Sequence, residues 1–207
     1  MQKYIILISY IIIGFSSCKK VSNDQIQAGI YVKQYKTNTP IANALVLITR
    51  GAPGSGVGTA IVDTLYTDEF GRVKYDKEVD ENYMYYAEAY KEGYFSTHNN
   101  QAGVTPGKKD FTTTIYMYAH SWVKLHVKNV NPYNQFDVIK FNSGCYTYQF
   151  QGIMDTTFLW CDNCNCAWFG DFNFDAGAFI IKNNLNYTQH FSFIPPPHDT
   201  ITVNINY

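Results

Sequence analysis

The sequence predicts an all-β protein in which two tandem β-sandwich domains follow an N-terminal signal peptide. Aromatic residues make up 17% of the chain and charged residues only 16%, against the roughly 25% charged residues typical of globular proteins. Aromatic and β-branched side chains suit the pleated surface of strands. No segment of ten or more residues combines helical periodicity with helix start and stop signals. Together these observations favour strands over helices.

The first seventeen residues have the pattern of a secretory signal peptide. Lys3 supplies a basic start, residues 4–15 form an apolar run, and two serines precede Cys18. The run is shorter than the roughly 20 apolar residues that a membrane-spanning helix needs. A buried N-terminal strand or helix is the alternative interpretation. The lysine, the length and the small residues together favour a cleaved signal.

The segment Phe15-Ser16-Ser17-Cys18 resembles the lipobox of bacterial lipoproteins, although Phe15 replaces the usual aliphatic residue. The resemblance implies that residues 1–17 are removed and that Cys18 becomes the lipidated, palmitate-bearing first residue. Residues 18–26 are then the lipidated cysteine and a polar tether. The next two residues include no aspartate of the kind that retains some lipoproteins in the inner membrane. The expected location is the bacterial outer membrane, with a lipid-anchored protein that is periplasmic or surface-exposed.

Length and charge limit the classes of function. Removal of residues 1–17 leaves 190 residues with 15 basic and 17 acidic side chains, a formal net charge of −2. That length suits one large β-domain or two of about 95 residues, and we favour two, at 27–119 and 120–207. The boundary is short, so we expect the domains to pack end to end. Because no basic patch is available to neutralise phosphates, nucleic acid is not an expected partner.

In the first half, strand patterns alternate with turn signals. Ile30 and Val32 alternate with polar neighbours, and the turn at 68–71 contains Gly71, which supplies the positive φ that tight turns need. Residues 51–58 (GAPGSGVG) are expected to form a flexible loop. The expected strands lie around residues 30–32, 44–49, 59–66, 72–76, 83–90 and 112–118.

Three motifs follow one another in this half: PIANALV at 40–46, TDEFGR at 67–72 and YAEAYKEGY at 86–94. In order and spacing they resemble the signatures of carboxypeptidase-regulatory-like domains, a transthyretin-like family of seven-stranded β-sandwiches. The resemblance covers about residues 27–118. It implies the fold alone, because the family name refers to an accessory domain and no peptidase activity follows from it.

The second half begins and ends with the clearest strand patterns of the chain. Val123, Leu125 and Val127 alternate with polar neighbours, and residues 200–207 do the same, so each strand has one buried and one solvated face. Five further strand candidates lie between them. Seven short strands predict a second, Ig-like sandwich. The five candidates are residues 136–141, 146–150, 154–160, 178–182 and 187–194.

If Cys18 carries lipid, the four cysteines of the second half are left to pair with one another. Disulfides are expected in an oxidising compartment, and they would fasten the upstream cysteine to the loop that holds the other three. Three pairings are open, and the one between Cys164 and Cys166 would be the most strained. Zinc is an alternative, although the C-x15-C-x2-C-x-C spacing departs from paired C-x-x-C motifs; free or redox thiols are another. The disulfide candidates are Cys145, Cys161, Cys164 and Cys166.

Asp171, Asn173 and Asp175 alternate along the chain as the first ligands of a calcium loop do. Ala176 stands where that loop needs glycine, and Lys182 stands where it needs a bidentate glutamate. A strand or turn with polar residues outward explains the alternation as well. We therefore expect no metal and no other cofactor, and keep these three residues only as calcium candidates.

The aromatic surplus suggests a glycan site in which flat rings stack on sugar rings. One candidate set surrounds the cysteine-rich loop, and another lies on the strand that ends near residue 90. A disulfide-held loop presents its rings without an ordering cost, whereas a strand turns about half of its rings to the core. The loop set is therefore favoured. The loop set is Trp160, Trp168 and Phe169, and the strand set is Tyr83, Tyr85, Tyr86, Tyr90 and Tyr94.

The sequence contains little that points to catalysis. Its five histidines are dispersed, neither H-E-x-x-H nor G-x-S-x-G occurs, and the loop at 51–58 lacks the Lys-Ser/Thr ending of a phosphate-binding loop. We expect a non-enzymatic, lipid-anchored binding or spacer module. Its partners would be the membrane, through the N-terminal lipid, and an unidentified protein or glycan. The alternatives are a glycan- or peptide-binding surface lipoprotein and a protein that binds zinc or calcium.

Overall fold

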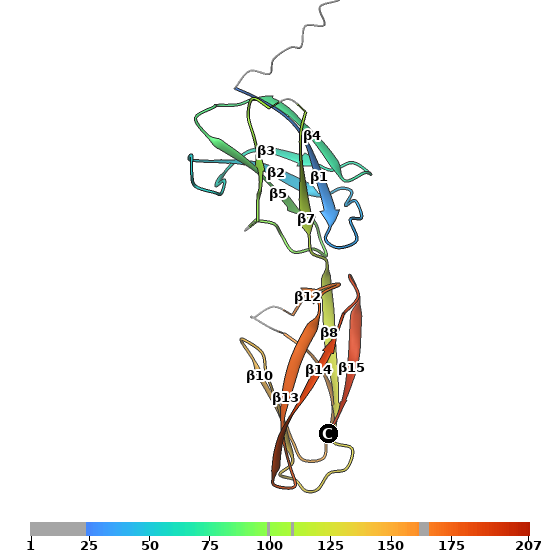
Figure 1. Cartoon of the computed structure of the whole chain (residues 1–207). Helices are drawn as coiled ribbons and strands as arrows, with labels where there is room; N and C mark the ends of the chain where they lie inside the picture. Colours follow the sequence, from blue (N-terminus) through green and yellow to red (C-terminus); the bar gives the residue numbers. More distant parts are fainter. Residues whose placement is uncertain (1–23, 99, 109, 162–165) are drawn as a thin grey trace, which may run out of the picture.

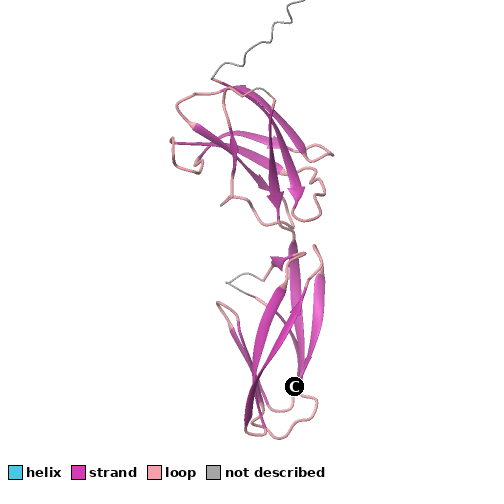
Figure 2. Cartoon of the chain, viewed as in Figure 1, coloured by secondary structure: helices cyan, strands magenta, loops and turns pink. Residues whose placement is uncertain are grey.

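The computed structural model describes residues 24–98, 100–108, 110–161 and 166–207 of the chain. In these ranges all regular secondary structure is β-strand (Figure 2), which confirms the predicted fold class. The strands form two domains that lie end to end, each around its own hydrophobic core (Figure 1). No helix in the described ranges is long and apolar enough to cross a membrane. Cys18 and the start of the expected tether lie outside the described residues.

The N-terminal domain is a sandwich of two sheets. Its strands are β1 (Gln25–Gln34), β2 (Leu45–Gly51), β3 (Ala60–Tyr66), β4 (Arg72–Glu78), β5 (Met84–Tyr90), β6 (Ala102–Val104) and β7 (Phe111–Met117). One sheet has the order β4-β1-β7 and the other the order β3-β2-β5-β6. β1 pairs antiparallel with β4 and parallel with β7, so the first and last strands of the domain are neighbours.

Strict alternation places one face of β1 in the core. Ile26, Ala28, Ile30 and Val32 are all buried, while the residues between them are partly exposed. Because the strand begins at Gln25, the last two residues of the tether expected over 18–26 belong to the sheet. The reason is that Ile26, which is fully buried, continues the apolar period of the strand.

The turn predicted at 68–71 is present, and its geometry explains why residue 71 is a glycine. The Asp68 carboxylate accepts hydrogen bonds from the amides of Phe70 (3.0 Å) and Arg72 (2.8 Å). Gly71 has φ of 68°, and a Cβ there would lie 2.6 Å from the Val32 carbonyl oxygen. Only glycine combines this backbone conformation with so close an approach of β1.

The C-terminal domain is a second sandwich. Its strands are β8 (His120–Lys128), β9 (Val138–Asn142), β10 (Thr147–Gln151), β11 (Asp155–Leu159), β12 (Trp168–Phe169), β13 (Phe174–Lys182), β14 (Leu185–Phe193) and β15 (Thr200–Asn206). One sheet has the order β10-β9-β13-β14; in the other, β8 lies between β11 and β15 and also pairs with the short β12. β15 runs parallel to β8, just as β7 runs parallel to β1.

Aromatic rings fill the C-terminal core. Phe141 is fully buried, and its ring centroid lies 5.6 Å from that of Phe158 and 6.3 Å from that of Trp160. Phe174, also buried, stacks on Phe193 with centroids 4.8 Å apart. Such ring pairs each contribute about 0.5–1.5 kcal/mol beyond their buried area. Part of the aromatic surplus is thus explained by packing.

The expected strands agree with the observed ones except where an element is very short or starts early. β6 and β12 have three and two residues, too few to show a period of two. β13 begins at Phe174 rather than near residue 178, because the buried Phe174 extends its apolar face. The extension places Asp175 within a strand.

The two ends of the described chain lie at opposite poles of the molecule. β1 starts at the pole farthest from the C-terminal domain and runs toward it, whereas Tyr207 lies at the pole farthest from the N-terminal domain (Figure 1). The boundary between the domains lies midway, where β7 ends and β8 begins.

Candidate functional site

The domain junction is held by backbone hydrogen bonds on both sides of a two-residue link between β7 and β8. The His120 amide donates to the Gly93 carbonyl (2.8 Å), and the Gly170 amide donates to the Ala119 carbonyl (2.9 Å). The His198 amide donates to the His120 carbonyl (2.7 Å). Loops of both domains are therefore hydrogen-bonded to the link, and these bonds limit rotation of one domain relative to the other.

Aromatic rings from both domains interlock around this link. Tyr35 of the N-terminal domain stacks on Phe172 of the C-terminal domain, with centroids 5.5 Å apart and planes inclined by 18°. The rings of Phe95 and Phe169 also meet across the boundary, with centroids 4.4 Å apart and planes inclined by 39°. Lys36 donates from Nζ to the Asp171 carbonyl (2.7 Å), and the same Nζ lies 4.6 Å from the Phe172 ring centroid. These side chains add direct contacts between the two domains.

Two histidines belong to the junction. The His120 ring lies edge-on to Phe95, with centroids 4.3 Å apart, and the His198 ring lies edge-on to Tyr94 at 4.6 Å. Burial lowers the pKa of His120, and the nearby His198 lowers it further. The neutral imidazole is therefore the form that suits the packed junction.

A groove lies on the outer face of the sheet β3-β2-β5, and we call it the tyrosine groove. Tyr66 on β3, Leu45 on β2 and Tyr90 on β5 are direct cross-strand partners and lie side by side in one row. Tyr66 is 68% exposed. The groove has a volume of about 630 Å³, within the range of ligand sites.

The rim of the tyrosine groove is polar and reaches the junction. The Lys91 ammonium group donates to the Asn43 carbonyl (3.3 Å), and Glu92 follows on the same loop. Tyr94 also lines the groove, donates its hydroxyl to the Gln34 side chain (3.2 Å) and packs on His198. One tyrosine ring thus belongs to both the groove and the junction.

A buried carboxylate lies beside the groove on the same face of β5. The Glu88 side chain is only 4% exposed, and its Oε2 lies 2.8 Å from His98 Nδ1 and 2.9 Å from Gln101 Nε2, which donates to it. Burial raises the pKa of Tyr90, and the charge of Glu88 and a hydrogen bond to it raise it further. Tyr90 is therefore held as a neutral phenol next to a buried acid whose Oε2 is hydrogen-bonded.

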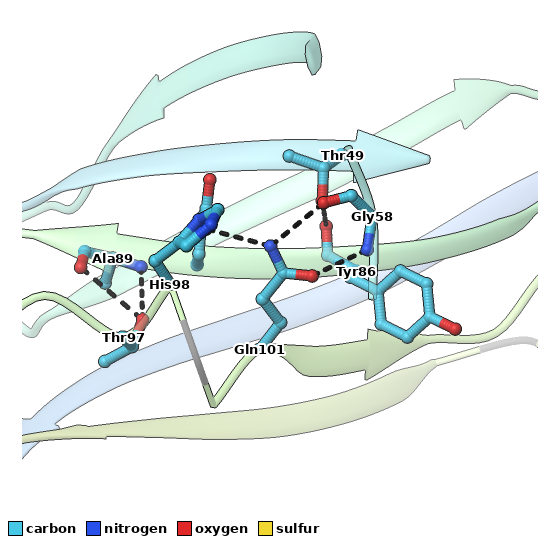
Figure 3. A network of polar contacts seen from close by, with 8 residues as sticks. Thr49, Gly58, Tyr86, Ala89, Thr97, His98 and Gln101 are labelled. Atoms are coloured by element: carbon cyan, nitrogen blue, oxygen red, sulfur yellow. Dashed lines mark hydrogen bonds and ion pairs between the residues drawn. The ribbon is translucent and has the colours of Figure 1, made fainter. Parts of the chain in front are cut away.

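Thr97, His98 and Gln101 make hydrogen bonds with the sheet, and Gln101 also ties the glycine-rich loop to it (Figure 3). The Gly58 amide donates to the Gln101 side-chain oxygen (2.7 Å), while Gln101 Nε2 donates to the Gly58 carbonyl (3.2 Å). Thr97 accepts from the Ala89 amide through its hydroxyl (2.7 Å). Because the bonds of Gln101 fix Gly58, the end of the loop 51–58 is held against the sheet.

The aromatic set predicted around the cysteine-rich loop does not form an exposed platform. Trp160 is 6% exposed, because its ring belongs to the core beside Phe141 and Phe174. Trp168 is half-buried with its ring 5.1 Å from that of Phe174. Phe169 is 40% exposed but packs in the junction. Of the strand set, Tyr85 and Tyr86 are buried, whereas Tyr90 and Tyr94 line the groove.

The cysteines form disulfides in the described part of the chain. Cys161 is bonded to Cys166, and Cys145 is also disulfide-bonded, while Cys164 lies outside the described residues. Of the readings left open by the spacing, this arrangement favours disulfides over a zinc site. Among the described residues no group of three or more His, Cys, Asp or Glu side chains is placed to hold a metal.

The calcium candidates are used structurally. Asp171 has φ of 64° in the turn before β13, and its carbonyl accepts from Lys36. The Asn173 side-chain oxygen accepts a hydrogen bond from the Ser192 hydroxyl (2.7 Å). Asp175 is exposed on β13. The structure does not bring these three side chains together as a ligand set.

Three strands of the C-terminal domain bring together four polar side chains centred on one histidine, a group that we call the histidine cluster. Its members are His126, Lys128, Asp155 and Asn204. His126 Nε2 lies 2.6 Å from Asp155 and Nδ1 lies 2.8 Å from Asn204, while Lys128 lies 2.7 Å from Asp155. The hydrogen bond with Asp155 raises the pKa of His126, with a smaller contribution from Asn204. Only the pairing of β8 with both β11 and β15 joins these residues, so no local motif signals them.

No family model and no curated protein sequence matches this chain. The resemblance of residues 27–118 to carboxypeptidase-regulatory-like domains therefore stays a prediction. Solved structures with some likeness include a Bacillus anthracis protein named TIE (11% identity, TM-score 0.40), of which this chain, matched over 88% of its length, spans about a third. Others are a streptococcal ancillary pilin (12% identity, 90% of this chain and 63% of that one, TM-score 0.40) and the minor pilin of Streptococcus agalactiae (12%, 87% and 94%, TM-score 0.37). Similarity this low adds nothing about function.

Proposed function

We propose that this chain is a lipid-anchored, non-enzymatic protein of the bacterial cell envelope, in which two β-domains form a stiff spacer. The observation that carries the proposal is the junction, where both backbone hydrogen bonds and aromatic pairs cross from one domain to the other. A flexible two-domain chain would need none of these contacts, since inter-domain motion is the ordinary expectation for small interfaces.

The direction of the chain supports the same function. Cys18 precedes β1 by only a few residues, and β1 starts at the pole farthest from the C-terminal domain (Figure 1). An anchor at Cys18 would therefore hold that pole near the membrane and direct the C-terminal domain away from it. Several acyl chains on one cysteine meet the requirement of more than one hydrophobic signal for stable anchoring.

The histidine cluster supports a non-enzymatic role. Asp155 and Asn204 each engage one ring nitrogen of His126, so neither nitrogen is available to a substrate without breaking a bond. Asp155 is shared with Lys128, whose hydrogen bond is the largest cause of its lowered pKa. The cluster links three neighbouring strands, and this structural use accounts for all four polar side chains.

The anchor is tested by metabolic labelling with a palmitate analogue and by fractionation of the envelope. The wild-type protein is expected to carry label and to sediment with membranes, whereas Cys18→Ser is expected to be unlabelled and soluble in the periplasm. Cys145→Ser, which removes a different cysteine, should keep the label. If Cys18→Ser still sediments with membranes, the anchoring proposal is wrong.

A further inference from the structure

We propose that the tyrosine groove binds a neutral saccharide chain, stacked on Tyr66 and Tyr90. The site does not depend on the lipid anchor, and it lies on a different domain from the cysteine-rich loop to which the sequence directed attention. Three properties of the groove lead to this ligand class: the spacing of its rings, the balance of charge at its rim and its place on a sheet face.

The rings form a row fixed by strand register. Leu45 is the direct partner of both Tyr66 and Tyr90, so the two tyrosines start from positions two strand spacings apart, about 10 Å. That distance is about twice the spacing of consecutive pyranose rings in an extended chain, so it suits the first and third of three sugars. The C–H groups on the face of a sugar carry slight positive charge and pack on the negative face of an aromatic ring. Leu45 offers an apolar surface between the two stacking positions.

The rim suits a ligand without net charge. Lys91 and Glu92 supply one charge of each sign, and Asn43 and Ser96 supply neutral hydrogen-bonding groups. A strongly acidic or basic ligand would meet a like charge as well as an opposite one, whereas hydroxyl groups both donate to and accept from such a mixed set.

The position of the groove disfavours an added peptide strand. The row crosses β2, whose backbone already pairs with β3 on one side and β5 on the other. Peptides that join a sheet need the free backbone groups of an edge strand. A peptide strand could join this sheet only at the free edge of β3, beside the row, whereas a ligand that lies over β2 and β5 binds through side chains on the sheet face, as a stacked sugar would.

The floor of the groove is ordered before any ligand arrives. Tyr90 lies on the central part of the sheet beside Glu88, which His98 and Gln101 hold in place. Tyr94 is fixed by Gln34 and by His198. Because Tyr90 and Tyr94 are ordered before binding, their rings lose little conformational entropy when a ligand packs on them.

The test uses the whole mature chain with Cys18→Ser, probed on an array of neutral and acidic oligosaccharides and then titrated with the neutral hits by calorimetry. We expect binding to at least one neutral oligosaccharide. Tyr66→Ala should weaken that binding about tenfold, the size of one aromatic contact, and Tyr66→Phe, which keeps the ring, should bind within about threefold of wild type.

Tyr133→Ala is the matched control, because Tyr133 is 60% exposed but lies in the other domain; its binding should equal that of wild type. Thermal unfolding of each variant shows whether the fold is kept, and Tyr66 is exposed enough for its removal to be tolerated. The proposal is overturned if no neutral oligosaccharide binds, if only acidic ones do, or if folded Tyr66→Ala binds as wild type does. None of these results touches the anchor, which the fate of Cys18→Ser decides separately.

Discussion

The ring of Tyr35 lies flat against the ring of Phe172 across the domain boundary, with centroids 5.5 Å apart. Tyr35 directly follows β1, the first strand of one domain, and Phe172 precedes β13 of the other. Their contact, together with the Lys36 hydrogen bond to the Asp171 carbonyl, fastens a turn of each domain to the other. Side chains therefore add to the backbone hydrogen bonds that join the two domains.

Phe172→Ala is expected to uncouple the domains. The change removes the ring that packs on Tyr35, Tyr118 and Phe169, each pair being worth about 0.5–1.5 kcal/mol. The same ring lies beneath Lys36. ¹⁵N relaxation should then give shorter and unequal tumbling times for the two domains, where wild type gives one common value. Phe136→Ala, at a site 64% exposed and away from the junction, should tumble as wild type. A common tumbling time for Phe172→Ala would show that the remaining contacts, the backbone bonds and the Phe95–Phe169 pair among them, suffice to join the domains.

Acid is expected to loosen the junction. Burial, and then His198, lowers the pKa of His120, so the folded junction binds fewer protons than the separated one. Its stability is thus full above the ordinary histidine pKa of about 6.5 and is lost as pH falls below it. ¹⁵N relaxation measured from pH 7.5 to 5 should show the tumbling times of the two domains becoming unequal as the pH falls. His198→Gln should move this change to lower pH, and an unchanged midpoint in that variant would argue against the pairing.

Gln101 is expected to control the order of the glycine-rich loop. Gln101→Ala removes both bonds to Gly58 and one donor to Glu88, which should cost about 1–3 kcal/mol and speed hydrogen exchange of the Gly58 amide. Gln101→Glu should destabilise the protein more, because it places a second carboxylate beside Glu88. Gln149→Ala, at an exposed position on β10, serves as the control. Equal stability of the two Gln101 variants would show that a second acid beside Glu88 carries no penalty.

Asp137 is expected to stabilise the loop between β8 and β9. It is 1% exposed and accepts hydrogen bonds from the Asn129 side chain (3.0 Å) and the Tyr133 amide (2.7 Å). Burial is the largest single influence on its pKa and raises it, but the hydrogen bonds from Asn129 and Tyr133, together with those from the Asn183 and Asn134 backbone, outweigh burial and lower the pKa of Asp137. Asp137→Asn should cost about 1–3 kcal/mol at pH 7, measured by urea unfolding.

The sign of the pH dependence follows from the lowered pKa of Asp137. Its contribution is present above the unfolded-state pKa of about 3.9 and is lost as pH falls through the lower folded value. The difference between wild type and Asp137→Asn should therefore shrink below pH 4. Asp155→Asn is the matched control: its carboxylate is exposed and its ion pairs are screened by solvent, so it should cost less. A larger loss for Asp155→Asn would show that burial is not the deciding factor.

Much of the fold could be predicted because strand periodicity is local. The alternation of Val123, Leu125 and Val127 predicted β8, and all three are buried. The turn at Asp68 was predictable for the same reason, since its hydrogen bonds span only four residues. The two-residue β12 was not, because it exists only through pairing with β8.

The candidate site was predictable only in part. Surplus tyrosine suggested stacking, and Tyr90 and Tyr94 were among the rings considered. Tyr66 was not, because its place beside Tyr90 depends on two strand registers that meet at Leu45. Trp160 misled for the converse reason. Its position beside a cysteine-rich loop suggested that the ring is exposed to a ligand, yet it lies in the hydrophobic core.

By itself, the sequence determined the β-rich class of this protein, the positions of its longer strands and the expectation of an address in the envelope, because periodicity, turn chemistry and the signal pattern are all properties of neighbouring residues. The tertiary structure alone decided which rings are buried, which side chains meet in the tyrosine groove and how the domains are joined. Those outcomes depend on pairing between distant strands, such as β2 with β3 and β5, and a shift of one residue in register would turn each side chain to the opposite face.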